Sequence, residues 1–355
     1  MKLGLRLNLY RAAALTVPVD LVQLAERLGY HSVWTAEAYG VDALTPLAYL
    51  AGFTKRLKLG TSLVQLAARP PATLAMQAMT IDAMAGGNRM IVGIGVSGPQ
   101  IVEGWYGQPW GRPNARLRDY IAIMRKVMQR AEPVSHDGPE IQLPYTGPGA
   151  LGQGKALRPI LHPVAPIPIW LGAGGPRNTA LAAEICDGWM PMGLGPEGVP
   201  GTIRDKLKPG FEVFGGTSVT ITDDVKGTLD AARPLSAMYV GGMGSRTHNF
   251  HADAMARRGF PEAAERIGEL WRAGRKAEAQ AAVPEEYLEQ TALVGSAARI
   301  RRRWESGFAA PGVTGMIIDS SQPEAIELMA ELAGVKDDAG LKDDAGQVRN
   351  AVTAP

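Results

Sequence analysis

The segment Val92–Gly107, VGIGVSGPQIVEGWYG, carries Gly93, Gly95 and Gly98 in the G-x-G-x-x-G spacing of a dinucleotide-binding Rossmann fold. That motif indicates a nucleotide site only when a helix follows at once and an acidic residue closes the next strand about 20 residues later. Here glycines and prolines follow, which predicts a long loop instead. Asp119 has suitable spacing but lies in the helical pattern ARLRDYIAIMRKVMQR. The segment therefore argues against a Rossmann fold, and its glycines need another explanation.

Apolar strand patterns alternate with helical patterns along most of the chain. We expect eight strands with helices between them, in the segments 3–10, 32–37, 57–66, 89–96, 167–175, 187–194, 211–224 and 312–319. Apolar parallel strands are buried on both faces, so this order predicts an α/β fold. A TIM (β/α)8 barrel with insertion segments fits eight such units, and an open doubly wound sheet is the competing topology.

The chain divides into one barrel domain, residues 1–335, and a C-terminal tail. The tail, residues 336–355, repeats K-D-D-A-G and has little apolar material, so we expect it to be disordered.

The composition excludes several classes of partner. The 355 residues include 37 basic and 35 acidic side chains, a net charge of +2, without a basic block, so we expect neither nucleic acid nor a membrane surface as a partner.

Arg6, Asn8 and Arg11 interrupt the N-terminal apolar pattern, which argues against a signal peptide and favours a cytoplasmic protein. The single cysteine and the scattered histidines lack the spacing of metal ligands, so no metal site is expected.

Two glycine-rich loops follow strands at the edge where barrels carry their active sites, the carboxyl ends of the strands. Pro176 follows the loop Gly172–Gly175 and suits the first position of a helix. N–H groups at the start of a helix bind phosphate. We favour a phosphate site there, with tight turns as the alternative. For Gly93 and Gly95, inside a strand, close packing is at least as good an explanation.

Three segments together resemble the luciferase-like monooxygenase superfamily, and more closely its coenzyme F420-dependent oxidoreductase branch. They are GYHSVWTAEAYGVDALTPLAYLA (29–51), the segment from LGTSLVQ to EGWYG (59–107) and IPIWLGAGGPRNTALAAEICDGWMP (167–191). The resemblance covers residues 1 to about 334. It implies a TIM barrel with insertion segments, a deazaflavin laid across the strand ends, and a homodimer.

The resemblance also implies roles for individual residues. A non-proline cis peptide after the third strand would lie behind the deazaflavin ring; here that bond joins Ser62 and Leu63, and Gln65 would line the cofactor tail. Of the two loops, one would approach the cofactor through Gly95, Val96, Ser97 and Gly98, and the other would hold its phosphate through Gly172, Ala173, Gly174, Gly175 and Pro176.

Glu37 matches an acidic residue that the family places after the second strand. The sugar-phosphate dehydrogenase relatives have a histidine where this chain has Ala38 and a glutamate where it has Pro99, so their mechanism is not expected here. Glu37 is then the best remaining acid–base group, or alternatively a structural carboxylate bonded to backbone.

We expect an oxidoreductase that passes a hydride between coenzyme F420 and a small organic substrate. The alternatives are an FMN-dependent monooxygenase of the same fold and a non-catalytic barrel that only carries a flavin or deazaflavin. The segment Tyr239–Phe250 would contact the substrate, with Arg246 either reaching an anionic group or solvated at a helix interruption.

Overall fold

The predicted barrel is present and closed. The computed structural model describes residues 1–11, 13–195, 197–244 and 249–335. Within them, eight parallel strands follow one another around the sheet, and β10 closes it by pairing with both β9 and β12. These strands are β1 (Lys2–Leu7), β2 (Ser32–Thr35), β3 (Lys58–Thr61), β5 (Met90–Gly95), β8 (Ile169–Ala173), β9 (Gly188–Pro191), β10 (Glu212–Ile221) and β12 (Gly315–Asp319). The fold is a TIM (β/α)8 barrel.

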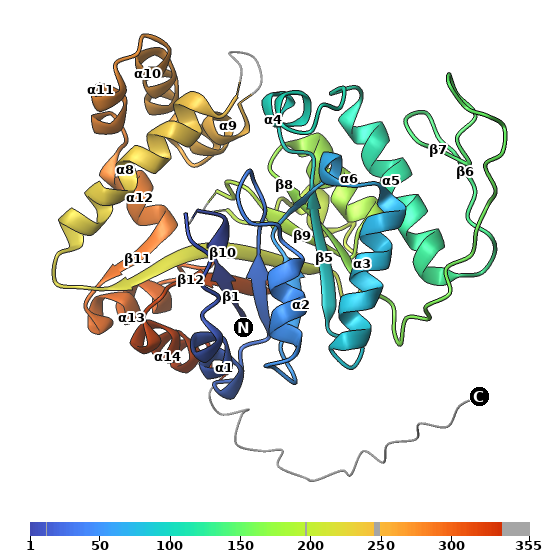
Figure 1. The fold of residues 1–355 in the computed structure, drawn as a ribbon. Helices are drawn as coiled ribbons and strands as arrows, with labels where there is room; N and C mark the ends of the chain where they lie inside the picture. Colours follow the sequence, from blue (N-terminus) through green and yellow to red (C-terminus); the bar gives the residue numbers. More distant parts are fainter. Residues whose placement is uncertain (12, 196, 245–248, 336–355) are drawn as a thin grey trace.

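Helices pack on the outside of this barrel (Figure 1). They are α1 (Val19–Arg27), α2 (Thr45–Ala51), α3 (Pro71–Met84), α5 (Pro113–Gln129), α6 (Pro176–Ile185), α13 (Ala297–Glu305) and α14 (Pro323–Leu332). Short elements lie between them: η1 (Leu9–Arg11), β4 (Val64–Gln65), η2 (Leu66–Ala68), α4 (Pro99–Gly104) and α7 (Gly201–Arg204). None of the described helices is long and apolar enough to cross a membrane.

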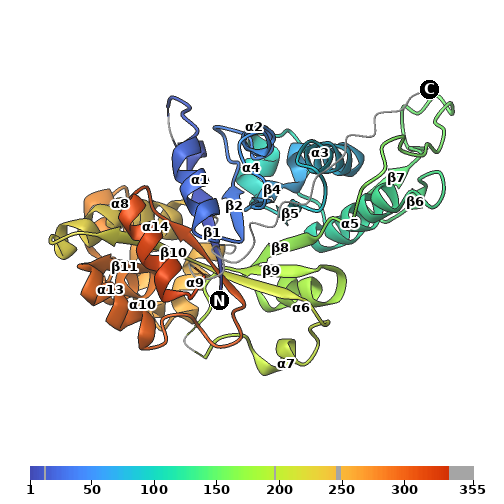
Figure 2. The ribbon, with the colours of Figure 1, turned by 90° about the horizontal axis from the view of Figure 1, so that it is seen from below.

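Two insertions lie on opposite sides of the barrel (Figures 1 and 2). One is a helical lobe of α8 (Val225–Gly242), α9 (Phe250–Arg257), α10 (Pro261–Arg272), α11 (Lys276–Ala281) and α12 (Glu285–Thr291). It has its own apolar core, which includes Leu229, Met255 and Ile267. The other carries the hairpin of β6 (His136–Asp137) and β7 (Gln142–Leu143). Residues 336–355 lie outside the described residues, so the division at residue 335 stays a prediction.

Two local predictions were wrong. A loop was expected after Gly98, but α4 begins at once, because Gly98 is extended and Pro99 occupies a first helical position that needs no N–H. A ninth parallel strand, β11 (Ala292–Gly295), pairs with the end of β10, outside the eight segments in which strands were expected. Neither restores a Rossmann crossover, since the sheet is a closed barrel.

Aromatic rings fill the barrel interior. Trp34 and Trp170 have their ring centroids 5.1 Å apart, and Phe214 lies 4.9 Å from Trp170. All three are buried, in one cluster with Ile91, Met190 and Ile317. Trp34 and Trp170 are therefore core residues.

Glycines make room for these rings. A Cβ atom at Gly60 would lie 2.3 Å from Cε3 of Trp34, and one at Gly188 would lie 2.7 Å from Cδ1 of Trp170. A Cβ at Gly315 would likewise lie 2.3 Å from Cε1 of Phe214. An eight-stranded barrel has an interior just wide enough for side chains, so each ring depends on a strand position without a side chain.

We predict that Gly60→Ala lowers the free energy of unfolding by about 1–3 kcal/mol, because the new methyl group must displace the buried Trp34 ring. Gly52→Ala is the control, since a Cβ there would meet only the carbonyl oxygen of Tyr49, at 3.6 Å. Urea denaturation of both variants measures the difference. Equal stability of the two variants would contradict the packing argument.

Candidate active site

A turn at the carboxyl end of β3 places Leu63 on top of the aromatic core. The peptide bond between Ser62 and Leu63 is cis, as the resemblance implies. Leu63 packs against the buried cluster inside the barrel. A Cβ at Gly172 would lie 2.2 Å from Cδ1 of Leu63, and one at Gly95 would lie 2.7 Å from it. These two predicted site glycines thus leave room for Leu63 at the mouth of the barrel.

Close packing also accounts for Gly93. Its N–H donates to Oγ1 of Thr61 at 2.8 Å, and the same hydroxyl donates to the Gly93 carbonyl at 2.8 Å. A Cβ at Gly93 would lie 2.0 Å from the Thr61 carbonyl oxygen. Gly93 therefore allows β3 and β5 to approach each other closely, which is the close packing considered for it from the sequence.

The rest of that loop turns sharply into α4. Ser97 has a φ of 61°, in the left-handed region that few residues other than glycine adopt. Val96 packs partly buried against the barrel core, and Gly98 precedes the helix in extended conformation. The structure thus brings Gly95–Gly98 to the same edge as Leu63.

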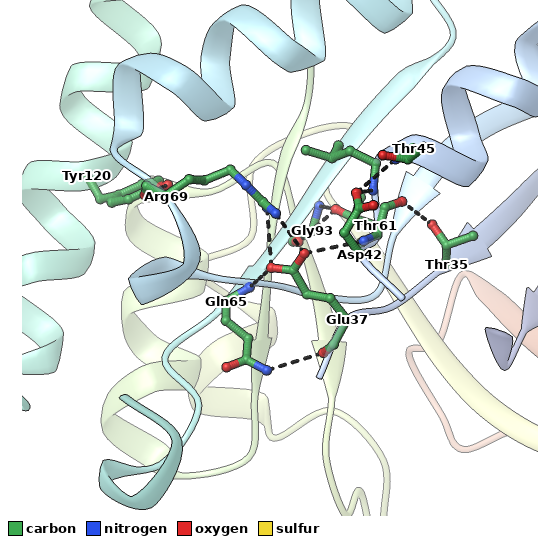
Figure 3. A network of polar contacts seen from close by, with 11 residues as sticks. Thr35, Glu37, Asp42, Thr45, Thr61, Gln65, Arg69, Gly93 and Tyr120 are labelled. Carbon is green, nitrogen blue, oxygen red and sulfur yellow. Dashed lines mark hydrogen bonds and ion pairs between the residues drawn. The ribbon is translucent and has the colours of Figure 1, made fainter. Parts of the chain in front are cut away.

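Glu37 forms hydrogen bonds that stabilise the turn carrying Leu63 (Figure 3). Its own N–H donates to the Leu63 carbonyl at 3.3 Å, and its Oε1 accepts from the Gln65 N–H at 3.0 Å. Arg69 donates to both carboxylate oxygens, at 3.3 and 2.9 Å, and the Ala43 N–H donates to Oε2 at 3.3 Å. The Glu37 side chain is only 3% exposed.

These contacts define what Glu37 can do. Four donors converge on its two oxygens, and an ionised carboxylate has about four lone-pair sites. A proton could reach the group only by breaking one of these bonds. The geometry therefore favours the structural carboxylate over the acid–base group, the two roles that the sequence left open. Arg69, the partner that sequence reasoning missed, is itself held by Tyr120, whose hydroxyl donates to the Arg69 carbonyl at 2.8 Å.

Gln65 has one unsatisfied atom. Its amide nitrogen donates to the Glu37 carbonyl at 3.2 Å, which fixes the side-chain orientation. Its Oε1 is buried and has no hydrogen-bond partner among the described residues. An orphaned buried acceptor is costly unless a ligand supplies a donor.

The second glycine-rich loop ends at the start of α6. Gly175 is extended before the helix, and Pro176 takes the first helical position, as expected. Within the described part of the chain, the N–H groups of Gly174 and Gly175 donate no hydrogen bond to the backbone of a loop or turn. Arg257 of α9 reaches this point, because a Cβ at Gly174 would lie 2.9 Å from its Nη2, which donates to the Met192 carbonyl at 3.3 Å.

The loop thus combines N–H groups at a helix start with a cation, the two features that bind anions. Sequence reasoning missed Arg257. Arg246, considered there only as a contact for an anionic substrate or as a solvated side chain, lies outside the described residues.

Comparison with known proteins identifies the family of this chain. The family model described as luciferase-like monooxygenase matches residues 6–315. The chain belongs to the luciferase-like monooxygenase family. One Mycobacterium tuberculosis relative of this family, named "Putative coenzyme F420-dependent oxidoreductase Rv3520c", is 45% identical over 348 residues, 94% of this chain and 99% of the relative.

Two solved structures of luciferase-like fold superpose over nearly the whole chain. The coenzyme F420-dependent tetrahydromethanopterin reductase of Methanopyrus kandleri has a TM-score of 0.72 and 23% identity, covering 93% of this chain and 97% of that one. An F420-dependent secondary alcohol dehydrogenase, solved with an F420–acetone adduct, has a TM-score of 0.70 and 15% identity, covering 94% and 98%. At these identities the likeness supports the fold alone.

We predict that Glu37→Gln lowers the free energy of unfolding by about 3–5 kcal/mol, because it leaves the Arg69 guanidinium buried without its counter-charge. Glu331→Gln is the matched control: its partner Arg301 is 40% exposed, so the loss should stay below about 1 kcal/mol. Chemical denaturation provides the readout. Unchanged stability together with a hundredfold or larger fall in turnover would instead identify Glu37 as the acid–base group.

Proposed function

We propose that this protein is a coenzyme F420-dependent oxidoreductase that transfers a hydride between the deazaflavin and a small organic substrate. The observation that carries the proposal is the relative of that name, 45% identical over 94% of this chain and 99% of its own length. The likeness extends through both insertions as well as the barrel.

The residues at the mouth of the barrel fit such a cofactor. Leu63 offers an apolar surface on which a planar ring can rest, since Gly95 and Gly172 leave it room. The buried Oε1 of Gln65 has a lone pair for a donor on the cofactor. Gly174 and Gly175 present N–H groups beside Arg257 to a phosphate.

In this proposal the protein binds and orients, and the redox chemistry belongs to the cofactor. When bound, coenzyme F420 supplies a two-electron hydride donor or acceptor with little reactivity toward oxygen. Glu37 and Arg69 hold the turn at Leu63 in place and so fix the surface against which the ring rests. We infer that Glu37 acts by positioning, while the group that handles a proton comes from elsewhere at the mouth.

The alternatives are an FMN-dependent monooxygenase and a barrel that binds the cofactor without turnover. FMN also carries a phosphate on a ribityl chain, so the same loop would suit it. A homodimer and a cytoplasmic location, expected from the sequence, stay predictions.

We predict that the purified protein binds coenzyme F420 at least about tenfold more tightly than FMN, a difference of about 1.4 kcal/mol. Quenching of cofactor fluorescence during titration measures both affinities. Tighter binding of FMN, with substrate-dependent oxygen consumption, would support the monooxygenase. Binding of F420 without turnover of any alcohol, aldehyde or unsaturated acceptor would support the non-catalytic barrel.

We predict that Gly174→Val weakens binding of coenzyme F420 by at least about tenfold, because its side chain would displace Arg257 and cover the N–H groups of the loop. Gly175→Ala is the control, since a Cβ there meets nothing within 4 Å and the N–H is retained. The same titration applies, with thermal unfolding to verify that both variants fold. Unchanged affinity in a folded Gly174→Val variant would mean that the loop does not bind phosphate and that its glycines only form a tight turn.

A further inference from the structure

Arg6 is a charged side chain directed into the barrel. Its strand neighbour Gly4 faces the interior, because a Cβ there would lie 2.4 Å from Nε1 of Trp34. Side chains two residues apart point to the same face of a strand, so Arg6 also points inward, one step closer to the carboxyl end of β1. It pairs in register with Trp34 on one side and Asp319 on the other.

The guanidinium extends past the neighbouring strand β12 and over a glycine of β10, two strands away. A Cβ at Gly216 of β10 would lie 3.2 Å from Nη2 of Arg6. Gly216 is exposed although it lies in the middle of β10. The space over Arg6 is therefore open to solvent and to a ligand.

Arg6 forms no ion pair with any residue that the structure describes. Its Nε is buried without a hydrogen-bond partner, and among the described residues no carboxylate lies within the 4.0 Å of an ion pair. The nearest acidic residue along the sheet, Asp319, accepts instead from Nδ2 of Asn8 at 2.5 Å. A guanidinium with an unmet donor offers the forked geometry that binds an oxyanion through two parallel hydrogen bonds.

The mouth of the barrel therefore has an apolar part and a cationic part. Leu63 lies over Gly95 and Gly172, and Arg6 lies over Gly216. Both stand above the same aromatic core, Leu63 by direct packing and Arg6 beside Trp34. A substrate that spans the two would set an oxyanion on Arg6 while its apolar body lies toward Leu63.

We propose that Arg6 binds the carboxylate or phosphate of the substrate, and that the enzyme therefore acts on organic anions. The assignment of the anion to the substrate rests on the proposed function, whereas the anion site itself rests on the geometry of Arg6. Asp319 lowers the positive potential at this site without occupying the guanidinium, which favours a ligand that makes direct hydrogen bonds.

Paired probes test the site. Benzoate and benzamide share shape and differ in charge, and inorganic phosphate tests the other oxyanion. Calorimetric titration with and without coenzyme F420 should give tighter binding of benzoate or phosphate than of benzamide. In Arg6→Gln the anion should bind at least about tenfold more weakly, while benzamide and coenzyme F420 bind as in the parent. Arg6→Lys, which keeps the charge but loses the fork, should fall between them.

Stability provides an independent readout. Because Arg6→Gln removes a partly buried charge without a partner, its unfolding temperature should equal or exceed that of the parent. The control Arg118→Gln, which breaks an exposed pair with Glu184 on the outer helices, should change neither anion binding nor cofactor binding.

Three results would overturn the proposal: anion binding unchanged in Arg6→Gln, a clear loss of stability in that variant, or a loss of coenzyme F420 affinity larger than the loss of anion affinity. The last result would assign Arg6 to the cofactor. If the parent binds benzoate through Arg6 but does not bind coenzyme F420, the anion site stands and the proposed function fails.

Discussion

The limited volume inside the barrel is the constraint on which the rest of the site depends. Two tryptophans and a phenylalanine occupy it, and they fit only because the residue in register with each ring on an adjacent strand is a glycine. With the interior filled to this level, the next side chains along the strands form the floor of the mouth. Leu63 and Arg6 take those places, and Gly95, Gly172 and Gly216 leave the space around them. Core packing and site shape thus depend on the same kind of contact, a glycine that leaves room for a neighbouring side chain.

The ion pair between Glu37 and Arg69 then holds the turn that carries Leu63. Glu37 contacts the backbone of this turn at two points, the Leu63 carbonyl through its own N–H and the Gln65 N–H through its carboxylate. Arg69 neutralises the carboxylate and is tied to α5 by Tyr120. A buried pair of this kind costs desolvation, which its four hydrogen bonds offset. What it contributes is a set of hydrogen bonds that hold the turn at Leu63 and Gln65 in the observed geometry.

The sequence predicted the architecture well and the site in part. Eight apolar segments that alternate with helical patterns were enough for the barrel strands, because each strand must be buried on both faces. β11 was missed because Ala292–Gly295 is short and lies between helical patterns, and α4 because its proline suggests a loop as readily as a helix start. The cis bond at Ser62 came from the resemblance, since nothing in a Ser-Leu pair distinguishes it.

The charged partners could not be predicted for a different reason. Arg69 meets a residue 32 positions away, and Arg257 meets a carbonyl 65 positions away, so both contacts exist only once the barrel and the lobe have folded. Arg6 looked like an interruption in an apolar N-terminus, although its position two residues after Gly4 directs it inward. A glycine, likewise, does not reveal whether its missing side chain makes room for a ring, a leucine or a ligand.

The contact of Arg257 with the barrel has a consequence for how the two cores behave. The helical lobe has its own apolar cluster, and through Arg257 it meets the edge of β9 at the start of α6. An anion bound by both Arg257 and the N–H groups of that loop would add a contact between the lobe and the barrel. Part of its binding free energy would then stabilise the lobe against local opening and against cleavage by proteases, because a ligand that binds only the folded state stabilises that state.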